Sequence, residues 1–198
     1  MESIENILRT ATDNQNRARK VIEQSGVVRC WENIGAKVNL VGSLKTGLLM
    51  KHRDIDFHIY TPQIKIGDSF RAMAQLAENP NIVKIEYVNL LQEADSCLEW
   101  HAWYRDERNL LWQLDMIHMT AGSPYDGYFE KIAERIAAVI TPEQRTTVLQ
   151  LKFETPDELE IAGIEYYLAV IRDNIRNYDD FCRWRQTNPL NGIVEWMP

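Results

Sequence analysis

The sequence has 198 residues and a formal net charge of −7, with 45% hydrophobic and 26% charged residues. These values are ordinary for a globular protein and allow one sizeable core, or two small lobes that share one. Because neutralising phosphates requires clustered Lys and Arg, the acidic balance argues against an extended nucleic-acid partner and favours a small-molecule or protein substrate.

Targeting signals and cysteine motifs are not found. No apolar run reaches the length of a membrane span, and the first five residues, MESIE, lack the basic-then-apolar layout of a signal peptide. We therefore expect a cytoplasmic protein with no membrane partner. Cys30, Cys97 and Cys182 are odd in number and form no C-x-x-C pair, so they predict neither a disulfide framework nor a zinc ribbon.

Helix and strand patterns alternate through the first half of the chain. Helical spacing of apolar residues predicts helices over 4–24 and 27–33, with Gly35 as a break. Residues 37–41 predict a strand, 43–50 a short helix, and 54–60 a strand that ends before Pro62. Asp68 is a candidate cap for a helix through Leu76. A third strand follows over 82–91.

Aromatic-rich segments at 97–104 and 110–118 predict a hairpin around residues 105–109. In its second strand, Leu111, Gln113, Asp115 and Ile117 share one face. A carboxylate among apolar neighbours requires a reason, which makes Asp115 a candidate functional residue.

The remaining chain has a different texture. Ser123-Pro124, Thr141-Pro142 and Thr155-Pro156 each place a hydroxyl residue before proline, a combination that suits helix starts. The first two pairs also have capping-box spacing to residues 126 and 144. We therefore expect an α+β protein, with a mixed α/β lobe over 1–120 and a helical lobe over 121–198.

The strongest chemical signal is Gly42-Ser43 followed by Asp54-Ile55-Asp56. A strand-to-helix turn attracts phosphate through its backbone N–H groups and the helix N-terminus. Strand alternation puts Asp54 and Asp56 on one face, where two like charges are costly unless a cation bridges them. Carboxylates are the ligands that Mg²⁺ prefers, and Asp115 could supply a third.

Nearby cations could neutralise phosphate. Lys45 is the best placed of them, Arg53 is a second candidate and Lys51 a third, although each could equally be a solvated surface group. Ser43 could also simply cap the short helix. Lone histidines are usually structural.

Residues 41–48, VGSLKTGL, and 53–57, RDIDF, together with Asp115 on a later strand, resemble the signature of the DNA polymerase β-like nucleotidyltransferase superfamily. The likeness covers roughly residues 37–118, and its motif is about fifteen residues long. Many small members have serine where this chain has Arg53. Size and charge resemble the small-molecule branch, such as antibiotic nucleotidyltransferases.

The resemblance implies a mixed sheet with flanking helices, two Mg²⁺ ions, and transfer of a nucleoside monophosphate from an NTP such as ATP to an acceptor hydroxyl. Gly42 and Ser43 would hold the triphosphate and Asp54 and Asp56 the metals. Asp115 would activate the acceptor or bind the second metal. The acceptor would be a small molecule or a protein, and a homodimer is compatible with the sequence.

Two other interpretations stay open at this point. A silent nucleotidyltransferase fold could serve as a binding or antitoxin-like module. A metallohydrolase could use the alternating His52, Asp54, Asp56 and His58 with a transition metal.

Overall fold

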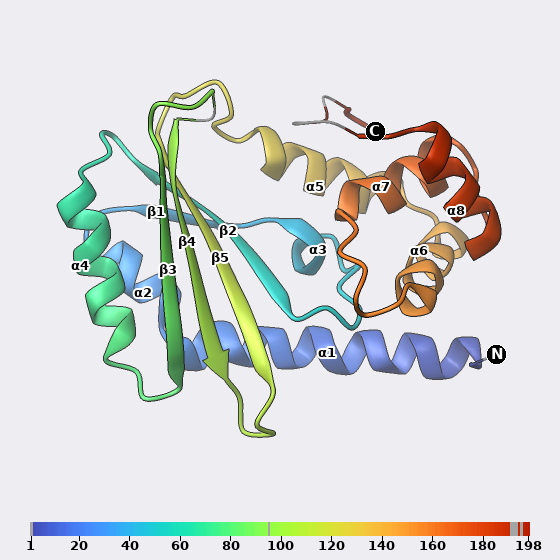
Figure 1. Ribbon diagram of the computed structural model, residues 1–198, viewed down its shortest axis with the longest axis horizontal. Coiled ribbons are helices and arrows are strands. Elements are labelled where there is room, and N and C mark those ends of the chain that lie inside the picture. The colour runs from blue at the N-terminus through green and yellow to red at the C-terminus, as the bar shows by residue number, and fades with distance from the viewer. Residues whose placement is uncertain (1, 95, 191–193, 195) are drawn as a thin grey trace.

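A computed structural model describes residues 2–94, 96–190, 194 and 196–198 (Figure 1). The strands are β1 (Lys37–Leu40), β2 (Asp54–Thr61), β3 (Ile82–Leu90), β4 (Cys97–Arg105) and β5 (Leu111–Thr120). The helices are α1 (Ile4–Ser25), α2 (Val27–Glu32), α3 (Gly42–Lys45), α4 (Ile66–Ala77), α5 (Tyr128–Val139), α6 (Pro142–Glu154), α7 (Gly163–Tyr167) and α8 (Tyr178–Thr187), and a π-helical turn, η1 (Leu168–Arg172), follows α7. No helix in the described ranges has the length and apolar character needed to cross a membrane.

The strands form one mixed sheet in the order β1-β2-β5-β4-β3. β2 and β5 run parallel at its centre, and the other neighbours are antiparallel. The predicted hairpin of β4 and β5 is confirmed. β2 is not an edge strand, because it lies between β1 and β5.

The sheet has one apolar and one polar face. The apolar face carries large buried side chains that pack against α1, α2 and α4 in the main hydrophobic cluster; they include Ile55, Phe57, Trp100, Trp112, Leu114 and Met116. On the other face, the alternate residues near Asp56 and Asp115 are polar or half-buried, whereas Tyr60, Cys97 and Met119 form a small buried cluster. Strand alternation thus leaves the part of this face around the carboxylates outside the main core.

A second cluster joins the helices that follow the sheet. It contains residues of α5, α6, α7, η1 and α8, together with Ile7 and Ala11 from the first half of α1. The second half of α1 contributes Ala18 and Val21 to the main cluster. In Figure 1, α1 accordingly runs beneath both halves of the molecule. The boundary at residue 120 stays a prediction, and α1 contributes side chains to both clusters.

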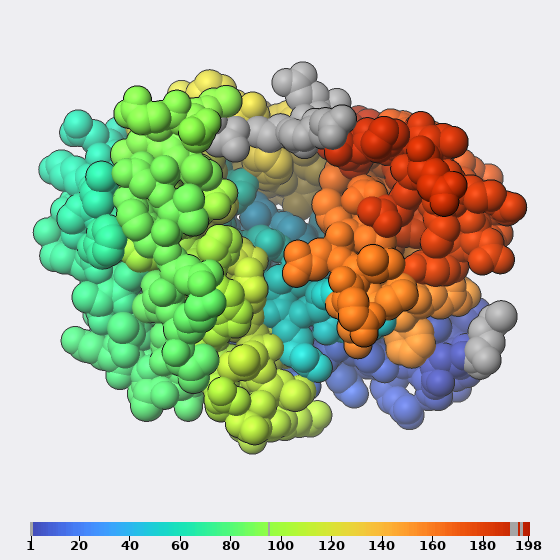
Figure 2. Space-filling view, in the orientation of Figure 1, coloured from blue at the N-terminus to red at the C-terminus, as the bar shows by residue number. Residues whose placement is uncertain are grey.

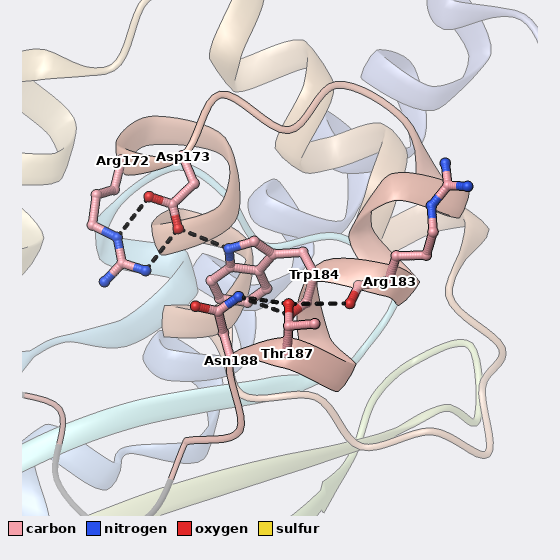
Figure 3. A network of polar contacts seen from close by, with 6 residues as sticks. All are labelled: Arg172, Asp173, Arg183, Trp184, Thr187 and Asn188. Atoms are coloured by element: carbon pink, nitrogen blue, oxygen red, sulfur yellow. Dashed lines mark hydrogen bonds and ion pairs between the residues drawn. The ribbon is translucent and has the colours of Figure 1, made fainter.

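Polar contacts attach the last helix to the π-helical turn (Figure 3). The indole N–H of Trp184 donates to Asp173 Oδ2 at 2.7 Å, and Arg172 donates to both oxygens of the same carboxylate. Asn188 and Thr187 donate to the Trp184 carbonyl and satisfy the C-terminal end of α8.

Of the three predicted helix starts, Thr141-Pro142 is confirmed, with a complete capping box to Gln144. Ser123-Pro124 instead forms a turn, since Gly127 is left-handed (φ 73°) and α5 begins only after it. Thr155 ends α6, and its hydroxyl bonds to the Leu151 carbonyl and to Tyr166. Proline after Thr155 disfavours helical backbone at that residue and stops the helix.

Two N-terminal boundaries also differ. The helix expected over 43–50 is a single turn, α3, because Gly47 is left-handed (φ 71°) and ends it. α4 begins at Ile66, so Asp68 lies in its first turn and pairs with Arg71 rather than capping the helix. A carboxylate in the first turn still interacts favourably with the helix dipole.

Glu130 connects α5 to the sheet. Its carboxylate accepts hydrogen bonds from Asn39 of β1 and Tyr60 of β2, both at 2.9 Å, and His58 Nδ1 lies 3.8 Å from its second oxygen. Burial acts to raise the pKa of Glu130, but the nearby His58 ring and the hydrogen bonds from Asn39 and Tyr60 prevail and lower it to about 2. The ionised carboxylate therefore stabilises the junction of sheet and helices.

We expect Glu130→Gln to lower the free energy of unfolding at pH 7 by about 1–3 kcal/mol, since it leaves buried partners poorly paired. A folded-state pKa below the ordinary value gives stability that is present above pH 4.5 and lost as pH falls toward 2. Urea denaturation should show the difference from wild type shrinking across that window. The exposed Glu134→Gln on the same helix is the control and should change little.

Candidate active site

The turn between β1 and α3 touches the carboxylate of Asp56. Gly42 is left-handed (φ 64°), and a Cβ added there would lie 1.9 Å from Asp56 Oδ2. The Val41 N–H donates to the Asp56 carbonyl at 2.9 Å and fixes the turn against β2. Glycine is required at residue 42 both for its backbone conformation and for this close approach.

Ser43 follows in the first turn of α3. It is buried, and its Oγ has no hydrogen-bond partner among the residues that the structure describes. Its backbone N–H interacts with Asp56 and acts to lower the pKa of that carboxyl. A buried hydroxyl without a partner is costly unless a ligand completes it, so Ser43 is suited to a polar ligand such as phosphate.

The three predicted carboxylates lie on the same face of neighbouring strands. In the parallel pairing of β2 with β5, Asp56 lies directly opposite Asp115, and Asp54 lies opposite Gln113. Burial, followed by repulsion from Asp54 and Asp115, raises the pKa of Asp56 to about 7, and only Lys152 and the Ser43 N–H oppose the rise. The site therefore has an unmet demand for positive charge.

Asp115 is held by two neighbours. His101 Nδ1 lies 2.5 Å from Asp115 Oδ1, and Gln113 Nε2 donates to the same oxygen at 2.8 Å. Neither His101 nor Gln113 was predicted as a site residue. The β4–β5 register, which sets His101 opposite Asp115, was the signal that could have identified His101.

The carboxylates border a cleft of about 1100 Å³ between the sheet and the helices. In Figure 2 it is the hollow between the green and yellow strands and the orange segment around α7. The helical wall is largely apolar and includes Phe129, Ile132 and Ile164, while Trp103 lies on the sheet side. A cleft of this size and mixed lining is typical of small-molecule sites.

Lys152 supplies a positive charge from the helical wall. Its Nζ donates to the Leu48 carbonyl at 3.1 Å and lies 5.6 and 5.5 Å from the rings of Tyr166 and Tyr167. Its charge acts on Asp56. Lys152 was not predicted as a site residue, and nothing in the local sequence marks it, because it lies 96 positions after Asp56.

The other predicted cations are placed differently. Arg53 lines the cleft, and its Nε is buried with no hydrogen-bond partner within the described ranges. Lys51 also lines it and pairs with Asp157 at 2.8 Å. Lys45 is exposed and is not among the cleft residues in the described part of the chain. Two helical steps, about 200° of rotation, turn it away from the side that Ser43 occupies.

Apart from His101, the histidines do not contact Asp54, Asp56 or Asp115 in the described part of the chain. His52 is exposed, and His58 packs edge-on against Phe129 beside Glu130. His118 lies on the apolar face, 2.8 Å from Thr61 Oγ1. Within the described ranges, no three His, Cys, Asp or Glu side chains are grouped closely enough to hold a metal on their own. Among the described residues, therefore, neither the hydrolase set of His52, Asp54, Asp56 and His58 nor the predicted trio of Asp54, Asp56 and Asp115 forms a complete metal site by itself.

No protein-family model and no curated protein sequence matches this chain. Solved structures do share its fold. Cid1 poly(U) polymerase with MgGTP bound matches 85% of this chain with a TM-score of 0.57 and 12% identity. GLD-2, from the non-canonical poly(A) polymerase complex GLD-2–GLD-3, matches 86% with a TM-score of 0.56 and 10% identity.

A cytoplasmic RNA terminal U-transferase gives a similar match, with a TM-score of 0.54 over 84% of this chain and 12% identity. This chain spans 55%, 58% and 51% of the three proteins, little more than half their length. At such identities the likeness shows the fold alone. It confirms the predicted α+β fold of the nucleotidyltransferase type.

We expect Gly42→Ala to lower the unfolding free energy by more than the roughly 1–2 kcal/mol of a left-handed alanine, because its Cβ must also displace the Asp56 carboxylate. Gly35→Ala is the matched control, since Gly35 has φ 80° and nothing within 4 Å of an added Cβ. Urea denaturation of both variants checks this. Equal losses would show that the close approach is not a constraint.

The raised pKa of Asp56 predicts a pH-dependent stability. The folded protein binds a proton that the unfolded chain releases near pH 3.8, so this contribution is lost as pH rises from about 4 through about 7. We expect metal-free Asp56→Asn to melt at a higher temperature than wild type at pH 8 and at a similar temperature at pH 4. Thermal melts in EDTA across this range test the sign.

Proposed function

We propose that this protein is a metal-dependent nucleotidyltransferase, which moves a nucleoside monophosphate from an NTP to a hydroxyl of a small molecule or a protein. One observation carries the proposal. Asp54, Asp56 and Asp115 border the same cleft as the Gly42–Ser43 turn, and the buried Ser43 hydroxyl lacks a partner in the part of the chain that is described. The match of the fold to Cid1 and GLD-2 supports the same reaction class.

The donor triphosphate would lie between the turn and the helical wall. Ser43 would donate to a phosphate oxygen, and α3 presents the N–H groups of its first turn there. Lys152 reaches the cleft from α6, and Arg53 adds a second cation beside Asp54. Charge-assisted bonds from these groups would hold the triphosphate and orient it for displacement.

The carboxylates fit Mg²⁺. Asp54 and Asp56 are oxygen ligands of the kind a hard cation prefers, and their repulsion is relieved by a bound cation. Mg²⁺ is typically held by one or two carboxylates plus substrate phosphates, which agrees with a ligand set that the protein leaves incomplete. When bound, the ions would neutralise charge on the attacking and leaving oxygens.

The chemical step is an in-line displacement. The acceptor oxygen forms a bond to the α-phosphorus, the bond from that phosphorus to the bridging oxygen breaks, and pyrophosphate leaves. Asp115 lies across from Asp56 and would receive or orient the hydroxyl proton. The apolar helical wall would exclude water from the phosphate.

The negative charge of the chain and of the cleft favours an acceptor other than a long RNA. The chain carries a net charge of −7, and the described cleft includes Asp157 and Glu160 in addition to the three carboxylates. An RNA strand would meet few cations here, in contrast to what phosphate-backbone binding requires. Cid1 and GLD-2 are named as polymerases of poly(U) and poly(A), so RNA is the acceptor that an assay must include.

We expect Asp54→Asn to abolish pyrophosphate release and to remove the stabilisation that Mg²⁺ with an NTP gives to wild type. A nucleotide at 100 times its Kd stabilises the folded protein by about 2.7 kcal/mol. A thermal-shift screen of the four NTPs, with and without Mg²⁺, identifies the donor. Asp13→Asn, an exposed change on α1, is the control and should behave as wild type.

The screen also separates catalysis from mere binding. Binding of Mg²⁺ and NTP without transfer to any of the small-molecule, protein or RNA acceptors would favour a silent binding module. Full activity in Asp54→Asn would overturn the proposed mechanism.

A further inference from the structure

We infer that His101, together with Gln113, is a positioning residue for Asp115. Both side chains bond to Oδ1, so Oδ2 is the oxygen that Asp115 presents to the metal and the acceptor hydroxyl. The inference rests on the proposed function and assigns roles to two residues outside the motif.

The hydrogen bonds determine which oxygen is free. An ionised carboxylate oxygen can only accept, so His101 Nδ1 carries the hydrogen that spans the 2.5 Å to Oδ1. Gln113 Nε2 donates to the same oxygen at 2.8 Å. Two donors fill the lone-pair sites of Oδ1. The other oxygen receives neither of these bonds.

The sheet holds His101 in place. His101 lies directly opposite Asp115 in the antiparallel pairing of β4 with β5, and Gln113 lies two residues before Asp115 on the same face. Glu99, two residues before His101 on β4, has a carboxylate oxygen 3.9 Å from Nε2. The imidazole therefore lies between two carboxylates, and its contact with Asp115 is the one within hydrogen-bond distance.

Asp115 requires this support because Asp56 repels it. The two carboxylates are opposite one another on adjacent strands, and Asp115 is one of the groups that raise the pKa of Asp56. Without its donors, Asp115 could relieve the repulsion by rotating away from the cleft. Small misplacements of a reacting group cost up to about a hundredfold in rate. Partners of metal ligands typically contribute about 10–100-fold in affinity or activity.

His101→Leu and His101→Asn make a matched pair. Asparagine places its amide nitrogen as many bonds from the backbone as Nδ1, so it can donate to Asp115, whereas leucine cannot. His101 lies on the cleft face with a quarter of its side chain exposed, so neither change should unfold the protein; thermal melts check this.

We expect His101→Leu to lower kcat by about 10–100-fold with less than a twofold change in KM for the NTP, and His101→Asn to recover most of the loss. Unchanged kcat in His101→Leu would overturn the inference, as would equal impairment of the two variants. A loss caused by general damage would not be rescued by asparagine.

A second readout does not depend on turnover. Electron paramagnetic resonance with Mn²⁺ and a non-hydrolysable NTP analogue measures the ions bound per chain and their affinities. We expect His101→Leu to weaken one Mn²⁺ by about tenfold and His101→Asn to leave it near wild type. Equal Mn²⁺ affinities in wild type and His101→Leu would overturn the role in metal placement.

The two proposals fail in different ways. If wild type transfers nucleotides, Asp56→Asn abolishes transfer and His101→Leu is unaffected, only the positioning role is wrong. If wild type binds no Mn²⁺ with the analogue and transfers nothing, the nucleotidyltransferase function itself is wrong, and the positioning role with it.

Discussion

The parallel pairing of β2 with β5 is the constraint on which the site depends. Adjacent strands lie about 4.8 Å apart, and two charges at about 5 Å repel by about 3 kcal/mol at an effective dielectric constant of 20. On the opposite face the same pairing buries Ile55, Phe57, Leu114 and Met116 almost completely. At about 1.5–3 kcal/mol for each side chain, that burial outweighs the repulsion. A slip of one residue would send Asp115 into the core, so the apolar face fixes the register of the acidic one.

The helices turn a charged sheet face into a cleft. Lys152 and the ring pair of Tyr166 and Tyr167 stand across from the carboxylates, and Lys152 reaches back to the carbonyl of Leu48. Glu130 holds α5 against β1 and β2. The distance between the helical wall of the cleft and the acidic face of the sheet is thus set by a few polar contacts as well as by the sheet.

Sequence patterns predicted the elements and the motif because both are local. Alternation placed Asp54 and Asp56 together on β2, and the fold class is confirmed by the shared architecture of Cid1 and GLD-2. The helix starts predicted at Ser123-Pro124 and Thr155-Pro156 were wrong. The left-handed Gly127 precedes the actual start of α5, and the proline after Thr155 ends α6 there.

Long-range partners could not be found from the sequence in the same way. The position of Lys152 depends on the packing of α6, and that of His101 on the register of β4. No local sequence pattern marks either residue as part of the site. Lys45 shows the converse. It was predicted to contact phosphate because it is close to Ser43 in sequence, but the rotation of α3 places it on the other side of the helix from Ser43. The site roles themselves, and the division into two lobes, stay predictions.

The course of α1 beneath both hydrophobic clusters has a mechanical consequence. A continuous 22-residue helix resists bending, so the sheet and the C-terminal helices both pack on one rigid element and are not joined by a hinge there. Opening the cleft would require one hydrophobic cluster to slide along α1, or α1 to break. A nucleotide would therefore enter a gap of nearly constant width, and little of its binding free energy would be spent on domain closure.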